Sequence, residues 1–124
     1  MTKVNVHYKF NKDALIDTIY NLAFEGNEID QKNDFKGDNN YAGIVKNVNV
    51  TDKINIEIKL GGIKKTKFKL ECTVIAIDQI GTDSKENPIY EEIGESMKID
   101  KTPIEEEIQE NTFYYSKKPY KIIL

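Results

Sequence analysis

The sequence predicts an α+β fold: a mostly antiparallel sheet of four to five strands, one helix packed on its apolar face, and a short second helix near the C-terminus. Apolar and polar residues alternate through residues 54–60 and 68–76, which is the period of a strand with one buried face. Residues 12–25 instead repeat apolar residues every three or four positions, which is the period of a helix. No shift in composition divides the chain, so we expect one domain spanning residues 1–124.

The two alternating runs are predicted to pair with each other as an antiparallel hairpin, because two glycines at residues 61–62 stand between them. A loop over residues 61–65 would place Ile56 opposite Leu70, and a loop over residues 61–63 would keep the same faces. Residues 44–50 continue the alternation and are expected to pair with residues 54–60 through a short turn.

The N-terminal part of the chain is predicted to supply one strand and the main helix. Residues 3–10 alternate and indicate a strand. Residues 12–25 indicate a helix that covers the sheet and ends at Gly26. Residues 27–40 are polar and show no period, so a long loop is expected. The inward stripe of the helix would comprise Leu15, Ile19, Leu22 and Ala23, widened by Ile16, Tyr20 and Phe24.

The C-terminal part is more polar. Turn-forming residues at 79–88 predict a loop, and the acidic stretch at 90–99 predicts a weak strand. The Thr-Pro-Ile-Glu sequence at residues 102–105 has the spacing of a capped helix start, which predicts a helix of about two turns at 103–111. Aromatic residues, lysines and one proline at 113–124 predict an edge strand or an extended arm.

Charge is distributed unevenly along a chain whose net charge is −3. Residues 44–77 carry seven lysines against three acidic residues, whereas residues 78–110 carry eleven acidic residues against three lysines. Arginine is absent, and it is the residue that makes bidentate contacts with guanine and phosphate. Its absence argues against sequence-specific nucleic-acid recognition, although AT-rich coding explains it equally well.

The residue types that carry catalysis do not form a recognisable motif. Residues 57–59 have the Glu-x-Lys spacing of metal-dependent nucleases, but neither Asp38 nor Asp52 falls on a preceding predicted strand. The single histidine, His7, lies on the polar side of its strand, and Cys72 lies on the apolar side of another. The acidic loop at 27–40 lacks the pattern of a calcium loop. We expect no enzymatic activity, cofactor or metal.

The protein is therefore expected to act by contact. A single cysteine and the lack of a leader or an apolar span indicate a cytoplasmic protein that does not enter the membrane. We expect a partner-binding, inhibitory or accessory module, bacterial or phage in origin, that binds another protein or copies of itself. The alternatives are a single-stranded nucleic-acid-binding protein and a self-assembling virion or complex component. The candidate partner-binding residues are Asp34, Phe35, Asp38, Lys64, Lys65, Lys67, Lys69, Tyr114, Tyr115, Lys117, Lys118 and Tyr120.

Overall fold

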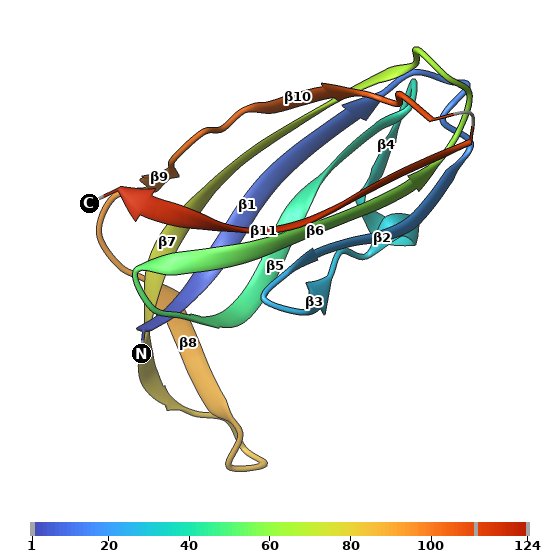
Figure 1. Cartoon of the computed structure of the whole chain (residues 1–124). Helices are drawn as coiled ribbons and strands as arrows, with labels where there is room; N and C mark the ends of the chain where they lie inside the picture. Colours follow the sequence, from blue (N-terminus) through green and yellow to red (C-terminus); the bar gives the residue numbers. More distant parts are fainter. Residues whose placement is uncertain (1, 111, 124) are drawn as a thin grey trace.

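The chain forms a two-layered β structure. The computed structural model describes residues 2–110 and 112–123, and most of them lie in strands. One continuous antiparallel sheet of eleven strands folds back on itself, so that its two halves face each other (Figure 1). The predicted α+β class is wrong, because the only helix in this part of the chain is α1 (Gln31–Asp34), a single turn. No helix among the described residues is long and apolar enough to cross a bilayer.

The first layer contains four strands in the order β3-β2-β6-β11. Their bounds are Thr18–Phe24 for β2, Asn27–Glu28 for β3, Lys53–Gly61 for β6 and Phe113–Ile123 for β11. Strand β6 is the central strand, since β2 pairs along one side of it and β11 along the other. This arrangement leaves one face of β6 against the core and the other against solvent.

The second layer contains β7, β1, β5 and β4 in that order, with β10 beside the start of β7. Their bounds are Thr2–Lys12 for β1, Phe35–Gly37 for β4, Asn40–Val50 for β5, Lys67–Thr82 for β7 and Ile104–Glu107 for β10. Strand β1 confirms the predicted N-terminal strand.

Two short strands extend this layer. Strand β9 (Met97–Ile99) pairs with both β7 and the end of β11, and so joins the two layers along one side. Strand β8 (Pro88–Glu92) pairs with the end of β7, and the two form a ribbon that projects away from the layers (Figure 1). The predicted weak strand at 90–99 is thus two strands, and much of the predicted loop at 79–88 belongs to this ribbon.

Alternate apolar residues of both layers meet in one core. Ile56 of β6 and Leu70 of β7 are both fully buried, as the alternation predicts. Complete burial of an aliphatic side chain of this size contributes about 1.5–3 kcal/mol, so each of these two residues stabilises the fold. The other core residues of the two strands are Ile54, Ile58, Leu60, Phe68, Cys72 and Val74.

The predicted pairing of these runs is nevertheless wrong. Strands β6 and β7 lie in opposite layers, so Ile56 and Leu70 approach the core from its two sides. The connection between the strands crosses from one layer to the other and bonds to distant segments: the Ile63 amide donates to the Leu15 carbonyl and the Lys65 amide to the Ile108 carbonyl. Strand β5 likewise pairs with β1 and β4, not with β6.

The predicted helix at 12–25 is a loop followed by strand β2. A bulge between Ile19 and Asn21 adds one residue to β2, so the inward-facing residues Ile19 and Leu22 are three positions apart. That spacing imitates a helical stripe. Ile16, in the preceding loop, is also fully buried and extends the imitation.

The predicted helix at 103–111 is wrong: residues 104–107 form strand β10, which pairs with the start of β7, and Asn111 lies outside the described residues. Ile104 and Ile108 are both buried, and a spacing of four suits one face of a strand as well as one turn of a helix. Pairing with β7 therefore overrides the helix propensity of the three glutamates between them. The predicted loop at 27–40 contains β3, α1 and β4. Of the two alternatives predicted for 113–124, an edge strand or an extended arm, β11 confirms the edge strand, because as far as Lys121 it pairs with β6 alone among the described residues. Leu124 lies outside these residues.

Candidate binding face

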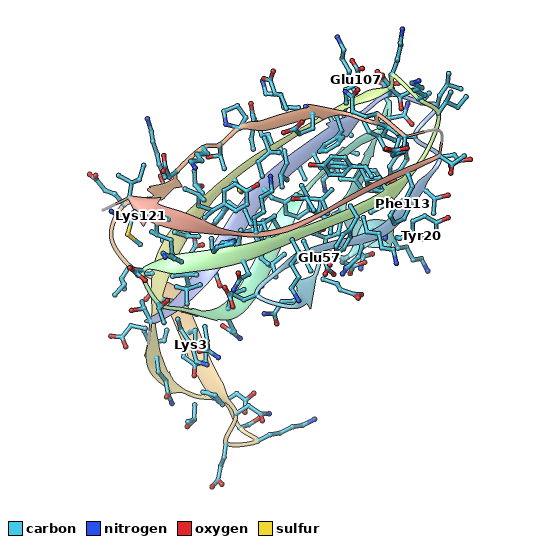
Figure 2. The ribbon with its side chains drawn as sticks, in the orientation of Figure 1. Lys3, Tyr20, Glu57, Glu107, Phe113 and Lys121 are labelled. Carbon is cyan, nitrogen blue, oxygen red and sulfur yellow. The ribbon has the colours of Figure 1, made fainter. Side chains whose placement is uncertain are left out.

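The outward surface of β2, β6 and β11 gathers three exposed aromatic side chains. Tyr20 is 58% exposed, Phe113 40% and Tyr115 52%. Figure 2 shows Tyr20 and Phe113 together at one end of this layer, Glu57 nearer its middle, and Lys121 at the opposite end of β11. We call this surface the aromatic face; it comprises Tyr20, Asn21, Lys53, Glu57, Lys59, Phe113, Tyr115, Lys117 and Lys121.

The bulge in β2 determines which side chains reach the aromatic face. Ile19 and Leu22 are buried, and the two residues between them, Tyr20 and Asn21, both stand on the outer side. A bulge leaves one extra residue outside the regular ladder and redirects the neighbouring side chains. One irregularity in the strand thus supplies an aromatic ring and an amide at adjacent positions.

Gly61 allows the Tyr20 ring to lie flat across the sheet. A Cβ atom on Gly61 would lie 2.9 Å from Cε2 of Tyr20, closer than such atoms approach. Gly61 pairs directly with Phe113 of β11, so the two rings flank it with their centroids 6.3 Å apart. The ammonium group of Lys59 lies 5.8 Å from the centroid of each ring. This cation–π arrangement holds the lysine between two aromatic side chains.

Glu57 occupies the centre of the face and is fixed on both carboxylate oxygens. The Asn21 amide donates to Oε1, and the Tyr115 hydroxyl donates to Oε2 at 3.1 Å. The bond to Glu57 raises the pKa of the Tyr115 hydroxyl. The amide oxygen of Asn21 is buried and has no hydrogen-bond partner among the described residues. The centre of the face is thus a hydrogen-bonded polar group with aromatic rings on either side.

Lysines dominate the other end of the face. Lys121 of β11 lies directly opposite Lys53 of β6, and like charges in directly opposed positions repel each other. Lys117 lies opposite Glu57, whose oxygens already accept two hydrogen bonds. The outer side of β6 and β11 therefore carries four lysines against one carboxylate, and acidic groups of a ligand would relieve the repulsion.

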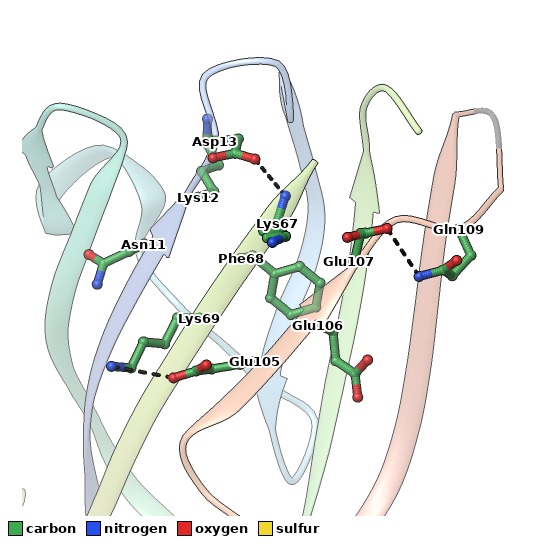
Figure 3. A pocket seen from close by; sticks show the side chains of 10 residues that line it. All are labelled: Asn11, Lys12, Asp13, Lys67, Phe68, Lys69, Glu105, Glu106, Glu107 and Gln109. Atoms are coloured by element: carbon green, nitrogen blue, oxygen red, sulfur yellow. Dashed lines mark hydrogen bonds and ion pairs between the residues drawn. The ribbon is translucent and has the colours of Figure 1, made fainter. Parts of the chain in front are cut away.

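A hollow of about 600 Å³ lies where β1 and β10 end and β7 begins (Figure 3). Part of its charge is paired within the chain. Lys69 pairs with Glu71 at 3.2 Å and with Glu105 at 3.5 Å, and the Asp13 carboxylate accepts the backbone amide of Lys67 at 2.6 Å. The two glutamates raise the pKa of the Lys69 ammonium. The hollow therefore mixes charges of both signs, whereas the outer side of β6 and β11 is mainly basic.

The chain matches no family model, no curated protein and no solved structure. Among residues 2–110 and 112–123, no three His, Cys, Asp or Glu side chains come together in a group that could hold a metal ion. Cys72 is 5% exposed, and burial raises the pKa of its thiol to about 12. What the aromatic face could bind is therefore inferred from its geometry alone.

The lysines predicted to bind a partner are divided between the layers. Lys64 and Lys65 lie in the connection that crosses from β6 to β7. Lys67 and Lys69 lie on β7, in the layer opposite the aromatic face. On β11, the predicted basic and aromatic residues are Tyr114, Tyr115, Lys117, Lys118 and Tyr120. The two predicted basic groups do not form one surface.

Strand β11 separates its predicted residues by alternation. Tyr115 and Lys117 point outward and belong to the aromatic face, whereas Tyr114 and Tyr120 are half-buried against the core. The Tyr114 ring meets Phe68 edge-on, with centroids 4.8 Å apart. Burial raises the pKa of both inward tyrosines. Lys118, between the two sets, is exposed.

The predicted residues of the 27–40 segment also separate. The Asp34 carboxylate turns toward the chain and accepts the hydroxyl of the buried Tyr8 at 2.8 Å. Phe35 is exposed and packs on Tyr41 with ring centroids 5.3 Å apart, and Asp38 forms part of a turn with a φ of 51°. Phe35 and Asp38 remain accessible, whereas Asp34 has a structural partner.

The predicted partner-binding residues do not include Tyr20, Asn21, Glu57, Lys59 or Phe113. The odd-numbered positions of residues 53–61 did indicate a solvent-facing side of that strand. What hid the face was the helical interpretation of residues 12–25, because a helix would have turned Tyr20 toward the core. The sequence did indicate the exposed side of two strands. It did not indicate which strands lie beside them.

Proposed function

We propose that this protein is a non-enzymatic intracellular contact module that binds a partner protein through the aromatic face. The observation that carries the proposal is the exposed group of Tyr20, Phe113 and Tyr115 around a lysine on a regular sheet surface. Aromatic residues are enriched at protein interfaces, where a few of them carry most of the binding energy. The single buried cysteine suits a reducing compartment.

Order within the face favours binding. Tyr20 is held across Gly61, Lys59 lies between two rings, and Tyr115 is bonded to Glu57. Side chains that already occupy their bound positions lose little conformational entropy when a partner docks. A partner that presents apolar groups to the rings and carboxylates to the lysines would match both the shape and the charge of this surface.

Four of the strand edges, those of β3, β4, β10 and β11, are poor alternatives to the face. Strand β3 has two residues and β4 has three, which is too short to template another strand. Strand β10 carries three consecutive glutamates, and the open edge of β11 carries residues 117–119, two lysines and a proline. Charges and proline at edges oppose pairing with another chain. We therefore favour docking on a face over strand addition.

Single-stranded nucleic acid is the second candidate ligand for the same face. Exposed rings beside lysines on a sheet can stack bases and contact phosphates. The central Glu57 carboxylate and the net charge of −3 oppose it. A salt titration with a mixed-sequence oligonucleotide separates the two ligand classes, because phosphate contacts produce a steep fall in affinity with salt. Tight, salt-sensitive binding would favour this candidate, and no binding at low salt would eliminate it.

The protein-partner proposal is tested by site-directed crosslinking. A photo-crosslinking residue at position 115 is used in the source cell, with the same residue at position 63 as control, since Tyr115 and Ile63 are equally exposed at 52%. The partner captured only from position 115 is then purified and titrated by calorimetry. We expect the double variant Tyr20→Ala, Phe113→Ala to lose about 2 kcal/mol or more of binding free energy. Unchanged affinity of that variant would refute the proposal.

A further inference from the structure

The ribbon formed by β7 and β8 is a second exposed apolar element. It spans residues 77–92, is called the β7–β8 arm here, and projects from the body at one end (Figure 1). Ile80 is 60% exposed and Ile89 is 41% exposed. A two-stranded ribbon without a supporting sheet is only marginally stable in water. Exposed isoleucines on such an element mark it as a surface that gains stability when it is covered.

The arm is nonetheless ordered at its tip and its base. At the tip, the Asp83 carboxylate accepts the backbone amides of Lys85 at 2.8 Å and Asn87 at 2.9 Å, and these bonds lower the pKa of Asp83. At the base, Glu92 accepts the Asn5 amide at 3.1 Å and also bonds to His7. An element held at both ends loses little freedom when it docks.

The charge of the arm is opposite to that of the aromatic face. Between residues 78 and 92 the arm carries five carboxylates and one lysine. The outer side of β6 and β11 carries four lysines and one carboxylate, and two of the lysines, Lys53 and Lys121, are directly opposed. Each surface thus combines exposed apolar groups with charge, and the two charges are complementary.

We infer that the arm of one copy of this chain docks on the aromatic face of a second copy. This inference rests on the proposed function, because it names the partner of the same face. Ile80 and Ile89 would cover the rings of Tyr20 and Phe113, and the arm's carboxylates would approach the lysines. Because every copy has one arm and one face, the contact is head-to-tail, and repetition gives a ring or an open filament.

Sedimentation velocity of the full chain tests the inference. We expect the average mass of the wild type to rise with concentration, and this rise to weaken as salt is added. The face variant is Tyr20→Ala, Phe113→Ala, and the arm variant is Ile80→Lys, Ile89→Lys. Each substituted residue is exposed, so both variants should retain the wild-type circular dichroism spectrum. Each variant alone should remain monomeric.

Mixing the two variants gives the decisive result. The arm variant retains its face and the face variant retains its arm, so an equimolar mixture should form a dimer and grow no further. A second pair of changes tests the charges: Glu86→Lys with Glu91→Lys should abolish assembly, and adding Lys59→Glu with Lys117→Glu, the two lysines nearest the rings, should restore it. Restoration supports direct contact between the two charged surfaces.

Three outcomes would overturn the inference: a wild type that stays monomeric at every concentration, a variant mixture that forms no dimer, or a charge swap that restores nothing. None of them refutes the proposed function. That proposal fails only if a crosslinked foreign partner binds the face variant as tightly as the wild type. Mass gained only on addition of an oligonucleotide would also overturn the inference, in favour of the nucleic-acid candidate.

Discussion

Replacing Gly43 by alanine should destabilise the protein by about 2 kcal/mol. A Cβ atom at this position would overlap the Asp34 carboxylate, which accepts the hydroxyl of Tyr8. If the carboxylate stays in place, the backbone must shift, and overpacking of this kind costs about 1–3 kcal/mol. If the carboxylate swings away, the Tyr8 hydroxyl loses its hydrogen-bond partner. Because the residue Tyr8 is only 3% exposed, this loss costs about 1–3 kcal/mol. The response with the lower free-energy cost determines the loss of unfolding free energy, and both responses cost free energy.

Urea unfolding followed by tyrosine fluorescence measures the loss, since the chain has no tryptophan. Gly81→Ala is the matched control, because a Cβ atom there meets nothing within 4 Å. In a Tyr8→Phe background no hydroxyl can be orphaned, so Gly43→Ala should cost about 1 kcal/mol less than in the wild type. A Gly43→Ala variant as stable as the Gly81→Ala control would refute this reasoning. An undiminished cost in the Tyr8→Phe background would show that the backbone shifts instead.

Three further outcomes follow from burial and hydrogen bonding. Leu70→Ala should lose about 2–5 kcal/mol of unfolding free energy, whereas Leu15→Ala, at a position 58% exposed, should lose under about 0.5 kcal/mol. Equal losses for the two variants in urea titrations would contradict the assigned core. Cys72 should react with a thiol reagent no faster than the protein opens locally or globally, because burial raises the pKa of its thiol to about 12. It should react as fast as a free thiol only in urea, and rapid labelling of the native protein would contradict this. Hydrogen bonds from His7 and Asn5 lower the pKa of Glu92 below its ordinary 4.5. The ionised Glu92 therefore stabilises the folded state above pH 4.5, and this contribution is lost as the pH falls through the lowered pKa. The urea midpoint of the wild type should therefore exceed that of Glu92→Gln at neutral pH, and the two should converge in acid; a constant difference would exclude the carboxylate as the cause.

Alternation in the sequence predicted which residues are buried but not which strands pair. Ile56 and Leu70 lie in one core, as their period requires, yet they approach it from different layers. A period of two identifies the dry side of a strand and carries no information about its neighbours. A glycine-bearing connection of five residues, 62–66, can close a hairpin or cross between layers. Contacts with Leu15 and Ile108, both remote in sequence, decide between these outcomes.

The candidate face was hidden for a related reason. One bulge moves the inward residues of β2 from a spacing of two to a spacing of three, and Ile19 and Leu22 then resemble a helical stripe. Tyr20 consequently changes from a predicted core residue to an exposed ring. Tyr115 and Lys117, by contrast, lie on a strand without a bulge, and both are among the predicted partner-binding residues. The bulge accounts for the omission of Tyr20 and Asn21, whereas Glu57, Lys59 and Phe113 lie on regular strands and were omitted because the neighbours of those strands could not be identified.

The central position of β6 has a consequence for biosynthesis. Its neighbours are far apart in sequence, with β2 before it and β11 well after it, so one flank of β6 stays unpaired until the ribosome has released β11. During translation that flank presents unpaired amides and carbonyls next to the four aliphatic residues of β6 that are buried in the folded protein. Such an edge is a template for pairing with another chain. Premature termination before Phe113 would make this hazard permanent, so truncated chains should accumulate in inclusion bodies even though most of the core residues are still encoded.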